Sequence, residues 1–387
     1  MEVRRVALLV SDFEDGGVER NFTHLASGLG RLGIDTRLIV GRDDHPYLDD
    51  LGEGVQVVQI TGDRVPWLRD FVPRERPDLL LTGKLADDFA AMRARADLGA
   101  AWPAETRLVA AVGTPLSGRL AGRRWNLLKT WREVRRIRAC YARLDGITAI
   151  SAGVAEDLRR FFHIDGVPIG VLNNPIVPEG HWRLAQAPCP HRWLASVTPG
   201  SPPAGRPLTI LAVGGLRQVK DFGTLIRAFA RLEDPEARLL ILGEGKERGS
   251  LTRLGWRLKL GDRLDLPGFV PSPYPFVARA RLLALSSVRE GLGNVVVEAL
   301  SVGTPVVATD CSDGLRTLFG QWGLGPLVPV GDAAALAGAL ERGLRRSWDT
   351  RALIAAAEPF GLLVSAQAHL DFFRSLAARP RRASPSP

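Results

Sequence analysis

The sequence predicts an α/β protein with two domains, each built on a doubly wound parallel sheet. In both halves, apolar strand-like runs are followed by a glycine-bearing turn and then by a segment with helical periodicity. Between residues 175 and 207 this rhythm gives way to a stretch rich in proline, glycine and serine. The length of 387 residues also fits two domains or slightly more.

The first half supplies the elements of one sheet. A strand is expected at residues 5–10, a turn at Gly16 and Gly17, and a helix over residues 21–32. Later strands are expected at residues 36–40, 79–81, 108–112 and 146–150. Because strands and helices alternate, we expect a parallel sheet covered on both faces.

The second half repeats this pattern from Leu208 onward. A strand is expected at residues 208–213, and later helices at 333–345 and 362–376. The chain is therefore divided into a first domain (1–178), a linker (179–206), a second domain (207–361), a C-terminal helix (362–378) and a tail (379–387). The tail, rich in Arg, Pro and Ser, is expected to be disordered.

Composition restricts the cellular setting. The three cysteines, Cys140, Cys189 and Cys311, are widely spaced and form no Cys-x-x-Cys or Cys/His pattern, so a reduced cytosolic compartment fits best. The N-terminal apolar run is too short for a signal peptide, and no stretch approaches the roughly 20 apolar residues of a membrane-spanning helix. We expect a cytoplasmic protein, soluble or peripheral at the inner face of the membrane.

The excess of 51 Lys and Arg over 42 Asp and Glu is concentrated between residues 119 and 143. An amphipathic helix is expected there, with Leu127, Trp131, Val134, Ile137, Tyr141 and Leu144 on its inner face. The basic residues are Arg119, Arg123, Arg124, Lys129, Arg132, Arg135, Arg136 and Arg143, beside Trp125. They are either simply solvated or also attract anionic lipid headgroups or a pyrophosphate-linked lipid acceptor. No aromatic platform or recognition motif indicates nucleic acid.

Two carboxylates, Glu290 and Glu298, lie eight residues apart across a glycine turn. The turn separates an expected strand at 281–287 from a short helix at 295–302, with Gly293 and Asn294 as its cap pair. The helix N-terminus would present free amides to an anion. Since carboxylates repel phosphate, we expect them to bind the sugar hydroxyls at either end of a diphosphate. The pattern therefore suggests a nucleotide-sugar site.

Five motifs in this order resemble the retaining glycosyltransferases of family 4. They are LAVGGLRQVKDFGTLIRAF (211–229), LLILGEG (239–245), LPGFV (266–270), the Glu290 to Glu298 element and GTPVVATD (303–310). GGVER (16–20) and the pair Asn174 and Pro175 match as well, so the resemblance covers most of the chain. It implies the GT-B architecture, two Rossmann-like domains facing across a cleft, with the last helix crossing back onto the first domain.

The resemblance also implies catalytic roles. Lys220, placed between a glycine turn and a helix capped by Asp221, would neutralise the donor diphosphate. The family's arginine directly after Gly214 is replaced here by Gly215, and Arg217 is the candidate to supply the second cation. Glu290 would hydrogen-bond the hydroxyls of the transferred sugar.

Donor binding is assigned to further residues by the same resemblance. Glu298 would bind the ribose, and the missing side chain of Gly17 would let the donor approach. The remaining donor-binding residues are Gly215, Val270 and, through backbone amides, Gly291, Leu292, Gly293, Asn294 and Val295. Val270 would lie at the edge of the base, although a role in the core is equally compatible. Gly243, Gly245 and Gly249 are expected to shape the nucleotide crevice.

The implied reaction transfers a hexose or N-acetylhexosamine with retention, without metal or other cofactor, from a nucleotide-diphosphate sugar to a glycan or lipid-linked acceptor of the cell envelope. Two departures stand out: Gly113 occupies the place of a histidine found in many relatives, and a glutamate that often follows the Thr309-Asp310 segment is missing. Two alternatives stay open: a catalytically silent GT-B protein that binds nucleotide-sugar or glycolipid, and a GT-B nucleotide-sugar epimerase.

Overall fold

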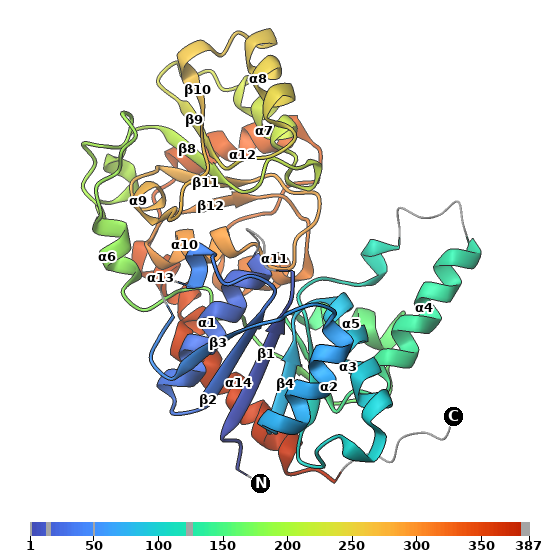
Figure 1. The fold of residues 1–387 in the computed structure, drawn as a ribbon. Coiled ribbons are helices and arrows are strands. Elements are labelled where there is room, and N and C mark those ends of the chain that lie inside the picture. The colour runs from blue at the N-terminus through green and yellow to red at the C-terminus, as the bar shows by residue number, and fades with distance from the viewer. Residues whose placement is uncertain (1, 13–16, 49–50, 121–126, 381–387) are drawn as a thin grey trace. The chain divides into compact units, whose positions relative to one another are not determined.

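The computed structural model describes residues 2–12, 17–48, 51–120 and 127–380 (Figure 1). The chain forms two compact units, one of residues 1–176 and 360–387 and the other of residues 177–359. We call them unit 1 and unit 2 and describe each by itself. The expected turn residue Gly16, the basic residues Arg123 and Arg124, and most of the tail lie outside the described ranges.

Unit 1 contains a parallel sheet in the order β3-β2-β1-β4-β5-β6-β7. Its strands are β1 (Arg5–Val10), β2 (Asp35–Val40), β3 (Val55–Gln59), β4 (Leu79–Thr82), β5 (Arg107–Val112), β6 (Gly146–Ala149) and β7 (Ile169–Val171). Its helices are α1 (Gly17–Arg31), α2 (Arg64–Glu75), α3 (Leu85–Leu98), α4 (Leu127–Tyr141), α5 (Ala152–Arg160) and α14 (Leu362–Ala377), with short 3-10 turns η1 (Pro46–Leu48), η2 (Gly99–Ala101) and η3 (Ser117–Arg119). β1 is buried on both faces, which explains its nearly continuous apolar sequence.

The C-terminal helix α14 belongs to the core of unit 1. Leu370 and Phe373 of α14 share one buried cluster with Leu25 and Leu29 of α1 and with residues of β1, β2 and β4. The two helices approach closely at Gly28, where a Cβ atom would lie 2.6 Å from the Cβ of Ala366. Only glycine permits this contact without moving one helix, so the sequence of α1 fixes where α14 docks.

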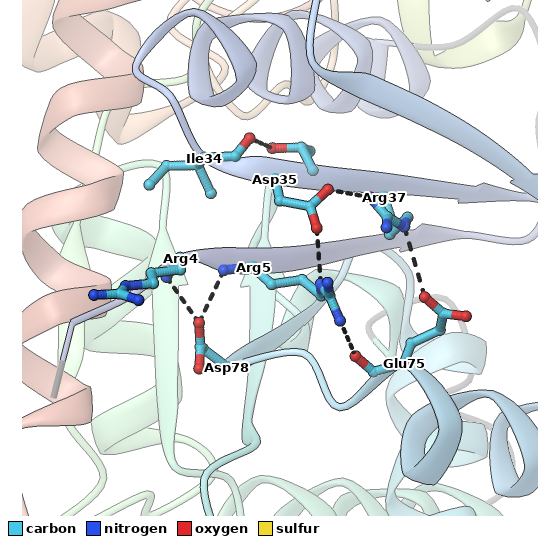
Figure 2. Close-up of polar contacts among 8 residues, drawn as sticks. Arg4, Arg5, Ile34, Asp35, Arg37, Glu75 and Asp78 are labelled. Atoms are coloured by element: carbon cyan, nitrogen blue, oxygen red, sulfur yellow. Dashed lines mark hydrogen bonds and ion pairs between the residues drawn. The ribbon is translucent and has the colours of Figure 1, made fainter.

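The amino end of this sheet is held by polar contacts, which Figure 2 shows. Asp78 Oδ2 accepts hydrogen bonds from the backbone amides of Arg4, at 2.7 Å, and Arg5, at 2.8 Å. The Arg5 guanidinium donates to Asp35 Oδ2 at 2.8 Å and to the carbonyl of Glu75 at 2.6 Å. These bonds join β1, β2 and the end of α2, and they satisfy backbone amides at the strand's start.

Unit 2 contains a parallel sheet in the order β10-β9-β8-β11-β12. Its strands are β8 (Thr209–Val213), β9 (Arg238–Leu242), β10 (Leu264–Gly268), β11 (Leu282–Leu285) and β12 (Val306–Ala308). Its helices are α6 (His181–Gln186), α7 (Phe222–Phe229), α8 (Arg248–Arg257), α9 (Tyr274–Val277), α10 (Asn294–Ser301), α11 (Asp313–Trp322), α12 (Ala333–Arg345) and α13 (Thr350–Ala357). The 3-10 turns are η5 (Pro203–Gly205), η6 (Gln218–Lys220) and η7 (Gly261–Arg263), and η8 (Glu358–Phe360) leads the chain back to unit 1.

Both sheets reverse their strand order once, between β1 and β4 in unit 1 and between β8 and β11 in unit 2. At such a point the loops from the carboxyl ends of two adjacent strands diverge, and ligands of open α/β sheets bind in the crevice that results. The fold therefore places a candidate binding site of unit 2 beyond Val213 and Leu285.

The predicted fold class is confirmed, with two parallel-sheet Rossmann-like domains. The sequence did not predict β3 and β7, which are edge strands without a fully buried residue. The prediction that Trp131 lies on the inner face of the basic helix is wrong, because 55% of its surface is exposed. Among the described helices, none combines the length and apolar content that crossing a bilayer requires.

Replacing Gly28 by alanine should destabilise the protein by about 1–3 kcal/mol, because the added methyl overlaps Ala366. The matched control is Gly320→Ala in α11, where a Cβ atom meets nothing within 4 Å. That control should gain up to about 1 kcal/mol from helix propensity. Denaturant unfolding of both variants measures the difference, and a Gly28→Ala protein as stable as its control would contradict the close docking of α14.

Candidate functional site

The site in unit 2 begins with the turn after β8. The chain passes through Gly214 and Gly215 into η6, which ends at Lys220. Asp221 then adopts a left-handed conformation with a φ of 45° and caps α7 by accepting a hydrogen bond from the amide of Thr224. The expected cap of this helix is confirmed, and it fixes Lys220 directly before the helix start.

Lys220 and Glu290 form an ion pair across the point where the strand order reverses. Lys220 Nζ lies 2.6 Å from Glu290 Oε1, and the same oxygen accepts a hydrogen bond from Ser287 Oγ at 2.8 Å. The side chains of Lys220 and Glu290 are 24% and 16% exposed, so water still reaches both. Two residues that the sequence assigned separately to phosphate and sugar are thus in direct contact.

Backbone and hydroxyl contacts hold the two loops of the pair together. The amide of Val288 donates to the carbonyl of Val219 at 2.8 Å, and Ser286 Oγ donates to the carbonyl of Lys220 at 2.8 Å. Thr309, after β12, donates through its hydroxyl to the carbonyl of Ser287 at 2.7 Å. The position of the ion pair is therefore built into the loops and does not depend on the two long side chains alone.

Glycines leave room for two cationic side chains over the turn after β8. A Cβ atom at Gly214 would lie 3.1 Å from Lys220 Cε, and one at Gly215 would lie 3.3 Å from Arg217 Nε. From the other side, a Cβ atom at Gly243 would lie 2.0 Å from the carbonyl oxygen of Gly214, so the loop after β9 supports the turn through another glycine. The Arg217 side chain thus folds back over Gly215.

Helix α10 begins at Asn294, with Gly293 as its N-cap in a left-handed conformation (φ 81°). Asn294 is therefore the first helical residue, and its expected place in the cap is taken by Gly293. Gly293 has no side chain to cap the helix, and its carbonyl accepts a hydrogen bond from the amide of Val296 at 2.9 Å. The side chains of Leu292 and Val295 are buried, so these residues could serve a ligand only through their backbones.

Glu298 lies one turn into α10 and is buried, with 2% of its surface exposed. Its neighbours Val297 and Ala299 are fully buried as well. A carboxylate at the surface of a solvated helix would be largely exposed. Glu298 is therefore not part of a solvated helix face.

The remaining predicted site residues are divided between unit 2 and unit 1. Val270 is half-buried and follows β10, beside the half-exposed Phe269. Gly291 is half-buried in the loop that carries Glu290. Gly17, by contrast, is the exposed first residue of α1 in unit 1. Gly113 follows β5, and a Cβ atom there would meet nothing within 4 Å.

The sequence reasoning missed the residues that support Glu290. Ser286 and Ser287 directly follow the buried apolar strand β11. Hydroxyls at the carboxyl end of a parallel strand, where ligands of such sheets bind, were the signal in the sequence. In the sequence, Cys311 contributed only to the expectation of a reduced compartment. It lies near the ion pair, and burial together with the Glu290 carboxylate raises its pKa to about 11, although the Thr309 hydroxyl and Lys220 act in the opposite direction. It is therefore a neutral thiol at physiological pH.

A charged cluster in unit 1 was also missed. At the carboxyl ends of β1 and β4, Lys84 Nζ lies 2.5 Å from Oε1 of the buried Glu19, and Arg64 Nη2 lies 2.5 Å from Asp12 Oδ1. These pairs tie the starts of α1, α2 and α3 to the strand ends. Within the described ranges, no three His, Cys, Asp or Glu side chains group in a way that would hold a metal ion.

Comparison with known proteins supplies the family. Residues 15–179 match the family model named Glycosyltransferase Family 4, and residues 199–358 match the one named Glycosyl transferases group 1. The chain belongs to glycosyltransferase family 4. The two family models match the two halves of the chain separately and together cover most of the sequence, as the motif order predicted.

Curated relatives match over part of their length. The chain is 36% identical over 190 residues to an N-acetylgalactosamine-N,N'-diacetylbacillosaminyl-diphospho-undecaprenol 4-alpha-N-acetylgalactosaminyltransferase of Campylobacter jejuni, a match covering 49% of this chain and 48% of the relative. It is 37% identical over 140 residues to the lipopolysaccharide core biosynthesis glycosyltransferase LpsE of Rhizobium meliloti, covering 36% and 40%. The chain thus spans less than two thirds of either relative.

The fold is shared with solved structures. HepE of Anabaena, crystallised with UDP and glucose, aligns with a TM-score of 0.72 at 18% identity, over 96% of this chain and all of that one. At this identity the likeness concerns the fold alone. It agrees with the GT-B architecture that the resemblance implied.

Proposed function

We propose that the protein is a retaining, metal-independent glycosyltransferase that moves a hexose or N-acetylhexosamine from a UDP-sugar to a glycan or lipid-linked acceptor. The observation that carries the proposal is the Lys220–Glu290 pair, held by Ser287 where the strand order of unit 2 reverses. The names of the relatives support a role in lipopolysaccharide or lipid-linked glycan synthesis, and the UDP complex of HepE supports the nucleotide.

In this proposal the donor diphosphate engages Lys220, and Glu290 turns to the sugar. Both contacts of Glu290 within the described residues use Oε1, which leaves Oε2 to accept a hydrogen bond from a sugar hydroxyl. The amides of residues 291–295, at the start of α10, would bind diphosphate and sugar. Glu298 would accept hydrogen bonds from the ribose hydroxyls, and Val270 would lie at the edge of the base. The missing side chain of Gly215 leaves room for Arg217, and the role expected of Gly17 stays a prediction.

The reaction breaks the bond between the anomeric carbon and the β-phosphate oxygen. The acceptor hydroxyl oxygen forms the new bond on the same face of the sugar, and its proton passes to the departing diphosphate, so configuration is retained. Negative charge grows on the diphosphate during this step. Lys220, a second cation and the N-terminus of α10 stabilise that charge, and a metal ion is not required.

Release of UDP from UDP-glucose, UDP-galactose and UDP-N-acetylhexosamines, with water as acceptor, tests the proposal. Glu290→Gln keeps the shape of the side chain but removes its charge, and the rate should fall at least about 100-fold. Glu233→Ala is the control, an exposed carboxylate in the loop before β9, at the opposite edge of the sheet. Wild-type turnover by Glu290→Gln would refute the assignment, and the absence of UDP release with every donor would refute the activity.

The second cation of the site is Arg217 in this proposal. The Cδ and Nε atoms of Arg217 lie over Gly215. Arg217 would therefore supply the positive charge that the family resemblance leads us to expect at position 215. In an Arg217→Ala protein the space above Gly215 becomes free. A side chain introduced at position 215 would then project along the same path.

Moving the arginine tests this exchange. Arg217→Ala should lower the turnover of UDP-sugar by about 100-fold, because one of two cations facing the diphosphate is lost. The double variant Gly215→Arg/Arg217→Ala should recover much of that loss. Full activity of Arg217→Ala, or a folded double variant as inactive as the single one, would show that Arg217 does not replace the relatives' arginine.

Helix α4 supports membrane attachment as part of the proposed function. Leu128 and Trp131 are exposed on it, together with Lys129, Arg132 and Arg135, and the Arg135 guanidinium lies 4.6 Å from the Trp131 ring centre. Apolar side chains flanked by cations are typical of helices that lie on anionic membranes. In this proposal the enzyme therefore works at the cytoplasmic face of a membrane, with α4 on the lipid.

Arg132→Gln/Arg135→Gln should weaken binding to phosphatidylglycerol vesicles by about tenfold or more at low salt, since each basic residue near an anionic surface contributes about 1 kcal/mol. The matched control is Arg159→Gln/Arg160→Gln, which removes two exposed arginines from α5. Equal binding of wild-type and Arg132→Gln/Arg135→Gln protein, or equal losses in both variants, would remove α4 from the proposal.

A further inference from the structure

A second apolar side chain surrounded by cations lies at the C-terminal end of α8 in unit 2. Trp256 is 81% exposed, the highest exposed fraction among the large apolar side chains of the described residues. It is followed by Arg257, Leu258 and Lys259, all exposed, and preceded one helical turn earlier by the exposed Arg253. We call these five residues the α8 tip.

The α8 tip is held by buried residues on both sides. Gly255 packs so closely on β10 that a Cβ atom there would lie 2.5 Å from Leu264 Cδ2. After the helix, Lys259 adopts a left-handed conformation with a φ of 54°, and Leu260 returns to the core. The backbone at both ends is thus anchored, and Figure 1 shows α8 beside β10 at this edge of the sheet. The exposed indole is a fixed feature of the fold.

The surroundings of Trp256 are basic. Arg253, Arg257 and Lys259 bring three cations, and the nearest carboxylate along the chain beyond them is Asp262, in η7. In water the apolar ring of Trp256 stays in contact with solvent. At a bilayer surface such a ring enters the headgroup region, and neighbouring cations contact the lipid phosphates. The charge of the tip therefore favours an anionic surface as the partner.

We propose that the α8 tip is a second membrane contact, which docks unit 2 on anionic phospholipid through Trp256, Leu258 and the cations around them. The inference stands on α8 alone and does not require the proposed enzymatic function or the contact through α4.

Flotation of the full chain with vesicles tests the proposal, using phosphatidylcholine alone or mixed with phosphatidylglycerol at low salt. Trp256→Ala should lower binding to the mixed vesicles about threefold or more. Arg257→Gln/Lys259→Gln should lower it about tenfold or more. Trp182→Ala on α6, a less exposed tryptophan, is the matched control and should bind as wild type does. The thermal midpoint of each variant establishes that it is folded.

The contribution of α4 is separated by repeating Trp256→Ala in a Trp131→Ala background. If the α8 tip contacts lipid, the double variant binds more weakly than Trp131→Ala alone. Equal binding of these two proteins would overturn the proposal, as would equal binding of wild type to both kinds of vesicle. Loss of binding in Trp182→Ala to the same extent as in Trp256→Ala would likewise overturn it, since the effect would not be specific to the tip.

Discussion

The contact between the Lys220 ammonium and the Glu290 carboxylate is the interaction on which the candidate site depends. It joins residues 70 positions apart, from loops that follow β8 and β11, and it places opposite charges where an anionic donor with a sugar would enter. Removing either partner would leave the other charge partly buried and uncompensated. Within the proposed function, Lys220 exchanges the Glu290 carboxylate for a phosphate, another anion, while Glu290 accepts a hydrogen bond from a neutral sugar hydroxyl.

The fold provides this contact through backbone geometry. A single reversal of strand order separates the loops after β8 and β11, and the bond from Val288 to Val219 joins them again just beside the pair. Because Gly214 and Gly215 have no side chains, those of Lys220 and Arg217 can pass over the turn. The Arg217 side chain passes over Gly215, and within the proposed function it offers the diphosphate a second cation.

The sequence was sufficient for the inner strands of unit 1, because buried parallel strands such as β1 read as continuous apolar runs. Through the motif order it singled out Lys220 and Glu290 as candidate site residues. The sequence could not predict that these two side chains are in contact, because the contact depends on the backbone hydrogen bond from Val288 to Val219. It also could not predict the hydrogen bond from Ser287 to Glu290, because Ser287 belongs to no motif. Helical periodicity placed Trp131 inside, but α4 buries a narrower stripe of residues such as Ile137 and Tyr141. Edge strands such as β7 bury too few residues to show a pattern.

A crystal structure of the protein with UDP bound tests the central claim most directly. The account predicts that a phosphate oxygen lies within hydrogen-bond distance of Lys220 Nζ, at the carboxyl edge of the unit 2 sheet, and that the ribose lies against Glu298. A structure with UDP bound elsewhere, while Lys220 stays paired with Glu290 and no phosphate reaches it, would contradict the account.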